Sequence, residues 1–284
     1  MTTRTLIDAG QLLPRLGTPR LRLFDCRFDL ARPDAGRRRY ADEHLPGAIY
    51  ADLNRDLSAP AARERGRHPL PAVEDFAARL RAWGVNIDSE VIAYDDGNGM
   101  YAARLWWMLR WLGHEEVAVL DGGLRRWEQL GLPLDEGVPA HPPGNFVARP
   151  RMRCTADAAE VAAAMDDPSV RILDARAPER YRGEAEPIDA LAGHVPGARN
   201  HPFTLNLDAQ GRMLPPDATG GAFTASLAGV PAERAIVMCG SGVSACHLLL
   251  ALEHAGLRGA RLYPGSWSEW TGDPVRPVRT GAEP

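Results

Sequence analysis

The sequence has few cysteines and lacks the cysteine pairs that bind metals or undergo redox exchange. It contains four, Cys26, Cys154, Cys239 and Cys246, and no C-x-x-C motif. A zinc site and a thioredoxin-type redox pair are therefore not predicted. Unpaired thiols fit a reducing compartment.

Long apolar runs and a strong charge excess are also missing. No apolar run reaches the roughly 18 residues of a membrane span, and Met1-Thr2-Thr3-Arg4 leads into a mixed segment instead of a signal sequence. The net charge of −4 gives no reason to expect nucleic acid or an anionic membrane as a partner. We predict a cytoplasmic protein, with the cluster Arg37-Arg38-Arg39 in a solvated loop.

An internal repeat divides the 284 residues into two similar halves. The run Leu-Phe-Asp-Cys-Arg at 23–27 is echoed by Ile-Leu-Asp-Ala-Arg at 172–176, and His-Leu-Pro-Gly-Ala at 44–48 is echoed by His-Val-Pro-Gly-Ala at 194–198. Such spacing predicts two copies of one domain.

The fold class follows from the pattern within each half. Short β-branched runs alternate with helical patterns at 75–83, 102–112 and 156–165, which predicts an α/β domain with a mainly parallel sheet flanked by helices. A Pro- and Gly-rich stretch near 138–150 has the composition of a linker. We predict an N-terminal domain over 1–138, a linker over 139–154 and a C-terminal domain over 155–284.

Cys239 is the leading candidate for a reactive residue. It opens the run Cys-Gly-Ser-Gly-Val-Ser-Ala at 239–245, which lies between an apolar strand pattern at 235–238 and an apolar helical pattern at 247–252. Inward-facing N–H groups of a Gly-rich loop and the positive end of a helix stabilise a thiolate. A nucleophile is predicted; a packing cysteine is the alternative, and this is the role expected of Cys246.

The same loop argues against phosphate chemistry and against a second catalytic site. A phosphatase or arsenate reductase needs an Arg six positions after the Cys, to clamp a tetrahedral anion, and Ala245 stands there. In the first half, Asp95 occupies the position that corresponds to Cys239. A carboxylate is no sulfur nucleophile, so only the second half is predicted to be catalytic, and the first half is predicted to contribute surface to a cleft.

The sequence resembles the tandem rhodanese-domain sulfurtransferases over nearly its whole length. The shared motifs include His-Leu-Pro-Gly-Ala at 44–48, Asp-Ala-Arg at 174–176, Arg-Tyr-Arg-Gly at 180–183 and Gly-Ser-Trp-Ser-Glu-Trp at 265–270. The loop at 239–245 is the most specific motif, and it looks like the version in family members that use 3-mercaptopyruvate.

The resemblance implies a ping-pong cycle without a metal or an organic cofactor. Cys239 takes sulfur from a small-molecule donor, becomes a persulfide, and passes the sulfur to a thiol, thioredoxin or cyanide. Backbone N–H groups of the loop would hold the terminal sulfur much as an oxyanion hole holds oxygen; they belong to Gly240, Gly242, Val243 and Ser244.

Two further residues are predicted to assist the proton transfer. Ser241 can hydrogen-bond the carbonyl or thiolate region of the donor and relay a proton; a turn residue bonded to its own backbone is the alternative. His68 matches a family histidine that faces the active loop and titrates near neutrality; a surface histidine is the alternative. The acidic residue that supports this histidine in some family members is replaced by Asn54.

Arg180 matches the family's substrate-anchoring arginine, suited to hold a carboxylate or sulfonate. The alternative is a surface ion pair with Glu179 or Glu184. A second anchoring arginine, expected in a Glu-Pro-x-x-Arg context, is missing from the segment at 186–189, and Arg182 is a candidate substitute.

These residues disagree about the sulfur donor. The loop carries no cation, which favours 3-mercaptopyruvate over the compact dianion thiosulfate, whereas the missing arginine favours thiosulfate. We predict 3-mercaptopyruvate, because the loop touches the reacting sulfur and the missing arginine chiefly weakens ground-state binding. A thiosulfate sulfurtransferase and a persulfide carrier without turnover of small donors are the alternatives.

Overall fold

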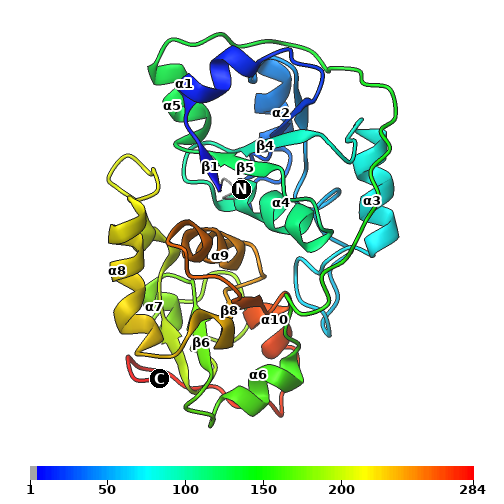
Figure 1. The fold of residues 1–284 in the computed structure, drawn as a ribbon. Coiled ribbons are helices and arrows are strands. Elements are labelled where there is room, and N and C mark those ends of the chain that lie inside the picture. The colour runs from blue at the N-terminus through cyan, green and yellow to red at the C-terminus, as the bar shows by residue number, and fades with distance from the viewer. Residues whose placement is uncertain (1–4) are drawn as a thin grey trace. The chain divides into compact units, whose positions relative to one another are not determined.

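The structure is a computed structural model that describes residues 5–284. Residues 1–4, from which we argued against a signal segment, lie outside the described residues. The described chain forms two compact units, each with its own parallel sheet (Figure 1). Among the described residues, no helix is long and apolar enough to cross a bilayer.

The first unit contains a five-stranded sheet in the order β1-β5-β4-β2-β3, and every adjacent pair is parallel. Its strands are β1 (Leu6–Ile7), β2 (Leu21–Asp25), β3 (Ala48–Tyr50), β4 (Glu90–Tyr94) and β5 (Val117–Leu120). Its helices are α1 (Ala9–Leu12), η1 (Leu13–Arg15), α2 (Ala35–Asp42), α3 (Val73–Ala82), α4 (Met100–Trp111) and α5 (Gly123–Gln129).

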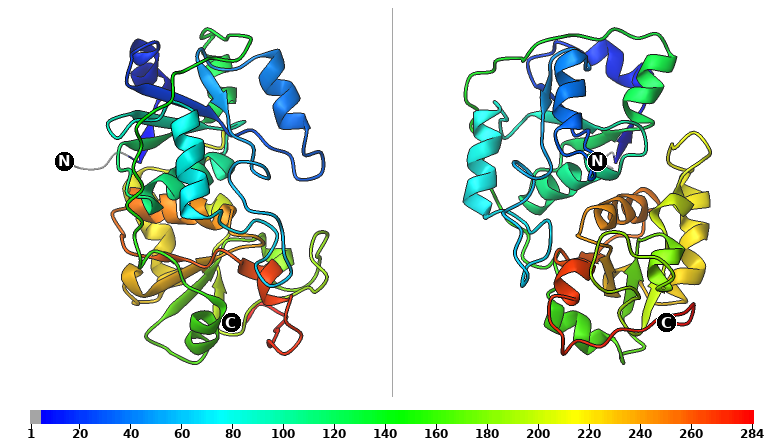
Figure 2. Two further views of the ribbon diagram at one scale, coloured as in Figure 1. Left: turned by 90° about the vertical axis from the view of Figure 1, so that its right-hand side faces the viewer. Right: turned by 180° about the vertical axis from the view of Figure 1, so that it is seen from behind.

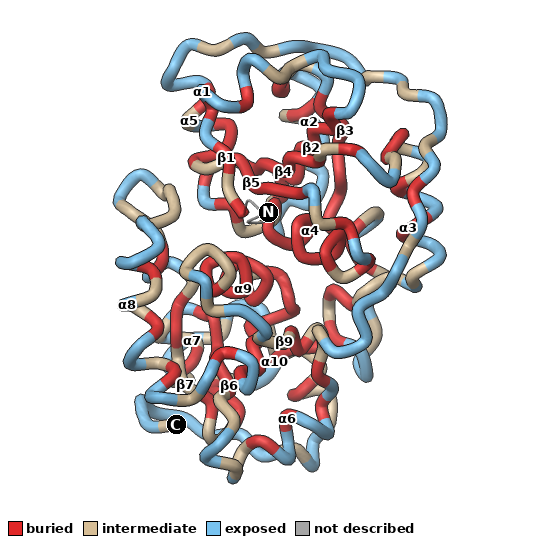
Figure 3. The backbone as a smooth tube through the Cα atoms, in the orientation of Figure 1, coloured by how far each residue is buried: buried red, intermediate tan, exposed pale blue. Residues whose placement is uncertain are grey.

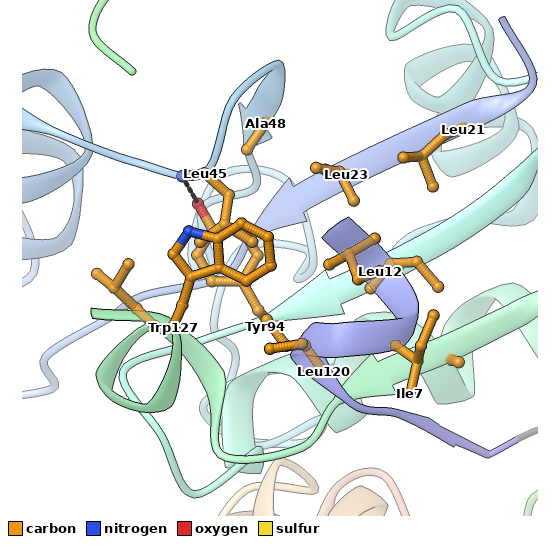
Figure 4. Packing of buried hydrophobic residues seen from close by; sticks show 13 residues of the cluster. Ile7, Leu12, Leu21, Leu23, Leu45, Ala48, Tyr94, Leu120 and Trp127 are labelled. Atoms are coloured by element: carbon orange, nitrogen blue, oxygen red, sulfur yellow. Dashed lines mark hydrogen bonds between the residues drawn. The ribbon is translucent and has the colours of Figure 1, made fainter. Parts of the chain in front are cut away.

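Helices cover both faces of this sheet, as alternating side chains on its strands require. Leu21 and Leu23 of β2 face a core that includes Leu12 of α1 and Trp127 of α5 (Figure 4). On the opposite face, the ring of Phe24 packs 5.1 Å from that of Trp83, which directly follows α3. The sheet is therefore buried on both faces, as its red strands in Figure 3 show.

The second unit contains a four-stranded parallel sheet in the order β7-β6-β8-β9. Its strands are β6 (Arg171–Asp174), β7 (Ala198–Asn200), β8 (Ala235–Met238) and β9 (Arg261–Leu262). Its helices are α6 (Ala158–Ala164), α7 (Pro178–Tyr181), η2 (Phe203–Asn206), α8 (Pro216–Leu227), η3 (Ala232–Arg234), α9 (Ser244–His254) and α10 (Ser266–Trp270). Helix α9 packs on β8 and β9, and further views of both units appear in Figure 2.

The predicted fold class is confirmed, with one local error. The helical patterns at 75–83, 102–112 and 156–165 correspond to α3, α4 and α6. The prediction that Arg37 to Arg39 lie in a loop is wrong, since these residues lie within α2. Gly36 and Tyr40, four positions apart, point into the unit, and the arginines between them lie on the more exposed faces of the helix.

The repeat is visible in matching side-chain contacts of the two units. In the first, the Arg27 guanidinium donates to Asp25 and to the Glu43 carbonyl oxygen. In the second, Arg176 donates to Asp174 and to the Gly193 carbonyl oxygen. Each buried ion pair therefore ties the end of one strand to the segment that leads into its neighbour.

Neither unit is a continuous stretch of chain. The segment at 60–70 packs as part of the second unit, and the segment at 208–213 packs as part of the first. The boundaries proposed from the sequence, at 138 and 155, remain predictions. His68 thus lies, through the segment at 60–70, in the same unit as Cys239.

Asp95 has a structural role in the first unit. Its buried carboxylate accepts N–H groups from Gly97 and Gly99 at 3.0 Å and from Tyr101 at 2.9 Å. Asp95→Ala is expected to lower the free energy of unfolding by about 3 kcal/mol, because buried donors are left unsatisfied. The sulfur transfer that the family resemblance predicts should persist in the folded variant. Urea denaturation together with turnover measurements tests both statements. Asp95→Asn keeps one acceptor oxygen, so its free energy of unfolding should lie between those of the wild type and Asp95→Ala. A folded Asp95→Ala protein without turnover would contradict the prediction.

Candidate active site

Cys239 directly follows β8, at the carboxyl end of the sheet, where parallel α/β proteins place their ligands. Its side chain is buried, and its sulfur lies 3.1 Å from the backbone nitrogen of Gly242, which donates to it. Helix α9 begins at Ser244, so its N-terminus adds partial positive charge near the sulfur. The loop is therefore built to stabilise negative charge on sulfur.

The sharp turn of this loop depends on Gly242. Its φ of +76° lies in the left-handed region, and a Cβ atom there would lie 2.4 Å from the Pro264 carbonyl oxygen. Both the backbone conformation and the close contact exclude a side chain. The turn directs the Gly242 N–H at the sulfur.

Ser241 and His68 meet beside the cysteine. The His68 Nδ1 atom lies 2.8 Å from the Ser241 Oγ atom, and both side chains are buried. The surface-histidine alternative for His68 is therefore wrong. A buried hydroxyl–imidazole pair of this kind can pass a proton.

A row of alternating charges runs along one side of the loop, and we call it the charge row. Arg180 pairs with Glu186 at 2.7 Å and with Asp189 at 3.1 Å, and Asp189 pairs with Arg67 at 2.7 Å. Glu186 also lies 3.5 Å from Arg176, whose own partner is Asp174. The charge row comprises Arg67, Asp189, Arg180, Glu186, Arg176 and Asp174, three cations and three carboxylates, so it is formally neutral.

Two of these arginines face the loop at Gly240. A Cβ atom at Gly240 would lie 3.3 Å from the Arg67 Nη2 atom and 3.4 Å from both terminal nitrogens of Arg180. Gly240 has no side chain, so the two guanidinium groups can approach the backbone next to Cys239. The loop itself carries no cation, as the sequence indicated, but two cations approach it from distant segments of the chain.

The candidate anchoring arginines form ion pairs, but Arg180 does so with partners other than those considered from the sequence. Arg180 pairs with neither Glu179 nor Glu184, the partners considered from the sequence. Arg182 pairs with Glu184, with its side chain about one-third exposed. The second arginine beside the loop is therefore Arg67 and not Arg182, the substitute considered from the sequence. The sequence analysis did not identify Arg67. The only available signal was its position next to His68.

A model of the rhodanese-like domain matches residues 8–130 and again residues 157–273. The chain belongs to the tandem rhodanese-domain sulfurtransferases. The match covers both units, in agreement with the repeat and the two parallel sheets.

Sulfurtransferases similar to this chain differ in the donor that their names carry. A Pseudomonas aeruginosa protein provisionally named 3-mercaptopyruvate sulfurtransferase is 50% identical over 99% of this chain and 100% of its own length. A Mycobacterium tuberculosis protein provisionally named thiosulfate sulfurtransferase is 40% identical over 98% of both chains. The solved structure of 3-mercaptopyruvate sulfurtransferase from Leishmania major matches with a TM-score of 0.85 at 30% identity, covering 98% of this chain and 76% of that one.

Within residues 5–284, no group of three or more His, Cys, Asp or Glu side chains is arranged to hold a metal ion. None of the four cysteines, all within the described residues, forms a disulfide. Cys246 is buried and its thiol lies 3.2 Å from the Gly242 carbonyl oxygen, as suits a packing residue.

Ser266 is a second residue that the sequence analysis missed. Its Oγ atom accepts the Cys239 N–H at 3.1 Å and donates to the Tyr263 carbonyl oxygen at 2.8 Å. Its φ of +52° lies in the left-handed region, and in the first unit the matching position is Gly123, with φ of +53°. The residues that follow show that Ser266 and Gly123 correspond. The Trp267 N–H donates to the backbone carbonyl oxygen of Cys239, and the Leu124 N–H donates to that of Asp95.

The strained backbone of Ser266 yields a testable difference. Both Ser266→Ala and Ser266→Gly remove the acceptor for the Cys239 N–H, but only the Ala variant keeps a side chain in the left-handed region. The Ala variant is therefore expected to be less stable than the Gly variant by about 1 kcal/mol, measured by urea denaturation. Equal stabilities, or a more stable Ala variant, would show that the conformation at Ser266 carries no strain.

Proposed function

We propose that this sulfurtransferase takes sulfur from 3-mercaptopyruvate, holds it as a persulfide on Cys239, and passes it to a thiol acceptor or to cyanide. The observation that carries the proposal is the loop at Cys239, with one N–H on the sulfur, the Ser241–His68 pair beside it and two guanidinium groups at Gly240. The proposed catalytic unit comprises the predicted domain over 155–284 together with the segment at 60–70, in a cytoplasmic protein.

In the first half-reaction, the Cys239 thiolate attacks the sulfur of the donor. A new S–S bond forms, the donor's C–S bond breaks, and its electron pair leaves on the methylene carbon as the enolate of pyruvate. The Ser241 hydroxyl, bonded to His68, donates a hydrogen bond to the developing enolate oxygen, and the pair supplies the proton that completes pyruvate.

In the second half-reaction, a thiolate or cyanide attacks the terminal sulfur of the persulfide. The S–S bond breaks and its electron pair returns to Cys239, which restores the thiolate. The Gly242 N–H, and the neighbouring N–H groups of Gly240, Val243 and Ser244, stabilise the negative charge while it lies on the terminal sulfur.

The charge row supports a donor with one negative charge at the anchor. Arg67 and Arg180 hold the donor's carboxylate, but Asp189 and Glu186 already compensate them. A neutral row attracts a compact dianion less than three bare guanidinium groups would. The neutrality of the charge row therefore favours 3-mercaptopyruvate. This reason differs from the one given in the sequence analysis, which was that the loop itself carries no cation.

Two observations keep thiosulfate as the competing donor. Two guanidinium groups within contact of Gly240 can also hold a sulfonate, and a relative named for thiosulfate is 40% identical. The persulfide-carrier alternative differs in kinetics, because a carrier forms the persulfide once and does not turn over small donors.

The test is kcat/KM of the reduced protein with each donor, with cyanide as the acceptor and Cys239→Ser as the control. A preference of tenfold or more for 3-mercaptopyruvate, about 1.4 kcal/mol of transition-state stabilisation, is expected. The reverse preference would assign thiosulfate. A persulfide without multiple turnover would assign the carrier role.

A further inference from the structure

The first unit contains a cavity of about 470 Å³ at the carboxyl ends of its strands. Among the residues that line it, Arg27 follows β2 and Asp96 follows β4, while α5 contributes Arg125 and Glu128. The Cys239 loop occupies the same end of the sheet in the second unit. The cavity therefore lies where the first unit would carry its own active site.

Arg39, which lines this cavity, is the counterpart of Arg180. The ring of Tyr40 stacks on His44 at 4.1 Å, and the ring of Tyr181 stacks on His194 at 3.8 Å. Arg39 precedes Tyr40 as Arg180 precedes Tyr181. An arginine thus occupies the anchor position in both units.

The cavity is open because one segment is short. Tyr40 and His44 are four positions apart, whereas Tyr181 and His194 are thirteen positions apart, so the second unit has nine more residues here. Those additional residues include Glu186 and Asp189, which pack against Arg180. The first unit has no such cover.

The chemistry of the cavity differs from that of the active site. Asp95, in the place of Cys239, is held by the N–H groups of its own loop. Asp96, in the place of Gly240, pairs with Arg39 at 2.8 Å. Because Asp95 is no sulfur nucleophile, the cavity is suited to binding and not to sulfur transfer.

The remaining charges of the cavity point to the kind of ligand. Within residues 5–284, Arg125 forms no ion pair, and neither do the carboxylates of Asp42, Glu43 and Glu128. These carboxylates are not arranged as a metal site. One exposed cation and three exposed carboxylates, none of them in an ion pair with another described residue, match an organic ligand with one carboxylate and more than one positive group.

We infer that this cavity binds a basic α-amino acid of the lysine or arginine type. The ligand's carboxylate binds Arg125, and its ammonium or guanidinium groups bind the carboxylates of Asp42 and Glu128. The volume lies within the usual range for small-molecule sites. This site is separate from the proposed sulfur transfer, so either proposal can fail without the other.

The test is titration calorimetry of the full chain with L-lysine, and with two molecules that each carry half of its chemistry. N-acetylglycine has the carboxylate alone, and cadaverine has the two ammonium groups alone. Each is expected to bind at least about fivefold more weakly than L-lysine, because each loses one set of charged contacts.

Three variants locate the site. Arg125→Ala and the double variant Asp42→Asn/Glu128→Gln are each expected to weaken L-lysine binding at least about fivefold. These residues are exposed, so the variants should fold, which circular dichroism checks. Arg180 lies beside the Cys239 loop and is the counterpart of Arg39, which lines the cavity. Arg180→Ala should leave L-lysine binding unchanged.

Several results would overturn the inference. One is the absence of saturable L-lysine binding with a Kd of about 1 mM or tighter. Others are binding that is lost in Arg180→Ala but kept in Arg125→Ala, and cadaverine or N-acetylglycine binding as tightly as L-lysine.

Discussion

Replacing Cys239 by Ser is expected to abolish sulfur transfer with either donor, a loss of about 10⁴-fold or more in kcat, because a hydroxyl is no sulfur nucleophile at neutral pH. The fold should persist, since the sulfur accepts one N–H, from Gly242, and an oxygen can accept the same bond. Turnover with cyanide measures the loss. Mass spectrometry after donor treatment should show one added sulfur atom on the wild-type protein and none on the variant.

Cys154→Ser is the matched control, because Cys154 is the most accessible of the other three cysteines. It should keep both the persulfide and the turnover. Residual turnover of Cys239→Ser, or loss of the persulfide in Cys154→Ser, would place the reacting sulfur elsewhere.

Arg180→Ala is expected to lower kcat/KM for 3-mercaptopyruvate by about 10- to 100-fold, mostly through KM. The guanidinium group faces Gly240 and offers charge-assisted hydrogen bonds worth about 1.5–3 kcal/mol. Arg67→Ala should act in the same direction. Since both arginines bind Asp189, the double variant should lose less than the sum of the two single effects.

Arg182→Ala is the control for this series, because Arg182 pairs with Glu184 at a more exposed position of the same motif. Its kcat/KM should equal that of the wild type. A large loss in Arg182→Ala together with little change in Arg67→Ala would return the second anchor to the position considered from the sequence.

The local features of this fold could be predicted because they depend on residues close in the chain. The strand at 235–238, the turn after Cys239 and the helix that follows are encoded by apolar runs around two glycines. Arg37 to Arg39 show where such signals fail: three charged residues resemble a loop until the helix buries Gly36 and Tyr40 on its other side.

The sequence alone carried the repeat, the two parallel sheets, the prediction that Cys239 is the nucleophile, and the aspartate at the matching position of the first half. Each of these is a local pattern of side-chain chemistry and backbone conformation, readable within a few positions. Tertiary structure decided what stands around the cysteine. Arg67 approaches Gly240 from 173 positions away and Ser266 reaches the Cys239 N–H from 27 positions away, as the residue numbers show. Such contacts are set by the packing of the whole unit, which no local pattern encodes, and so are the ion-pair partners of Arg180 and the open cavity beside Arg39.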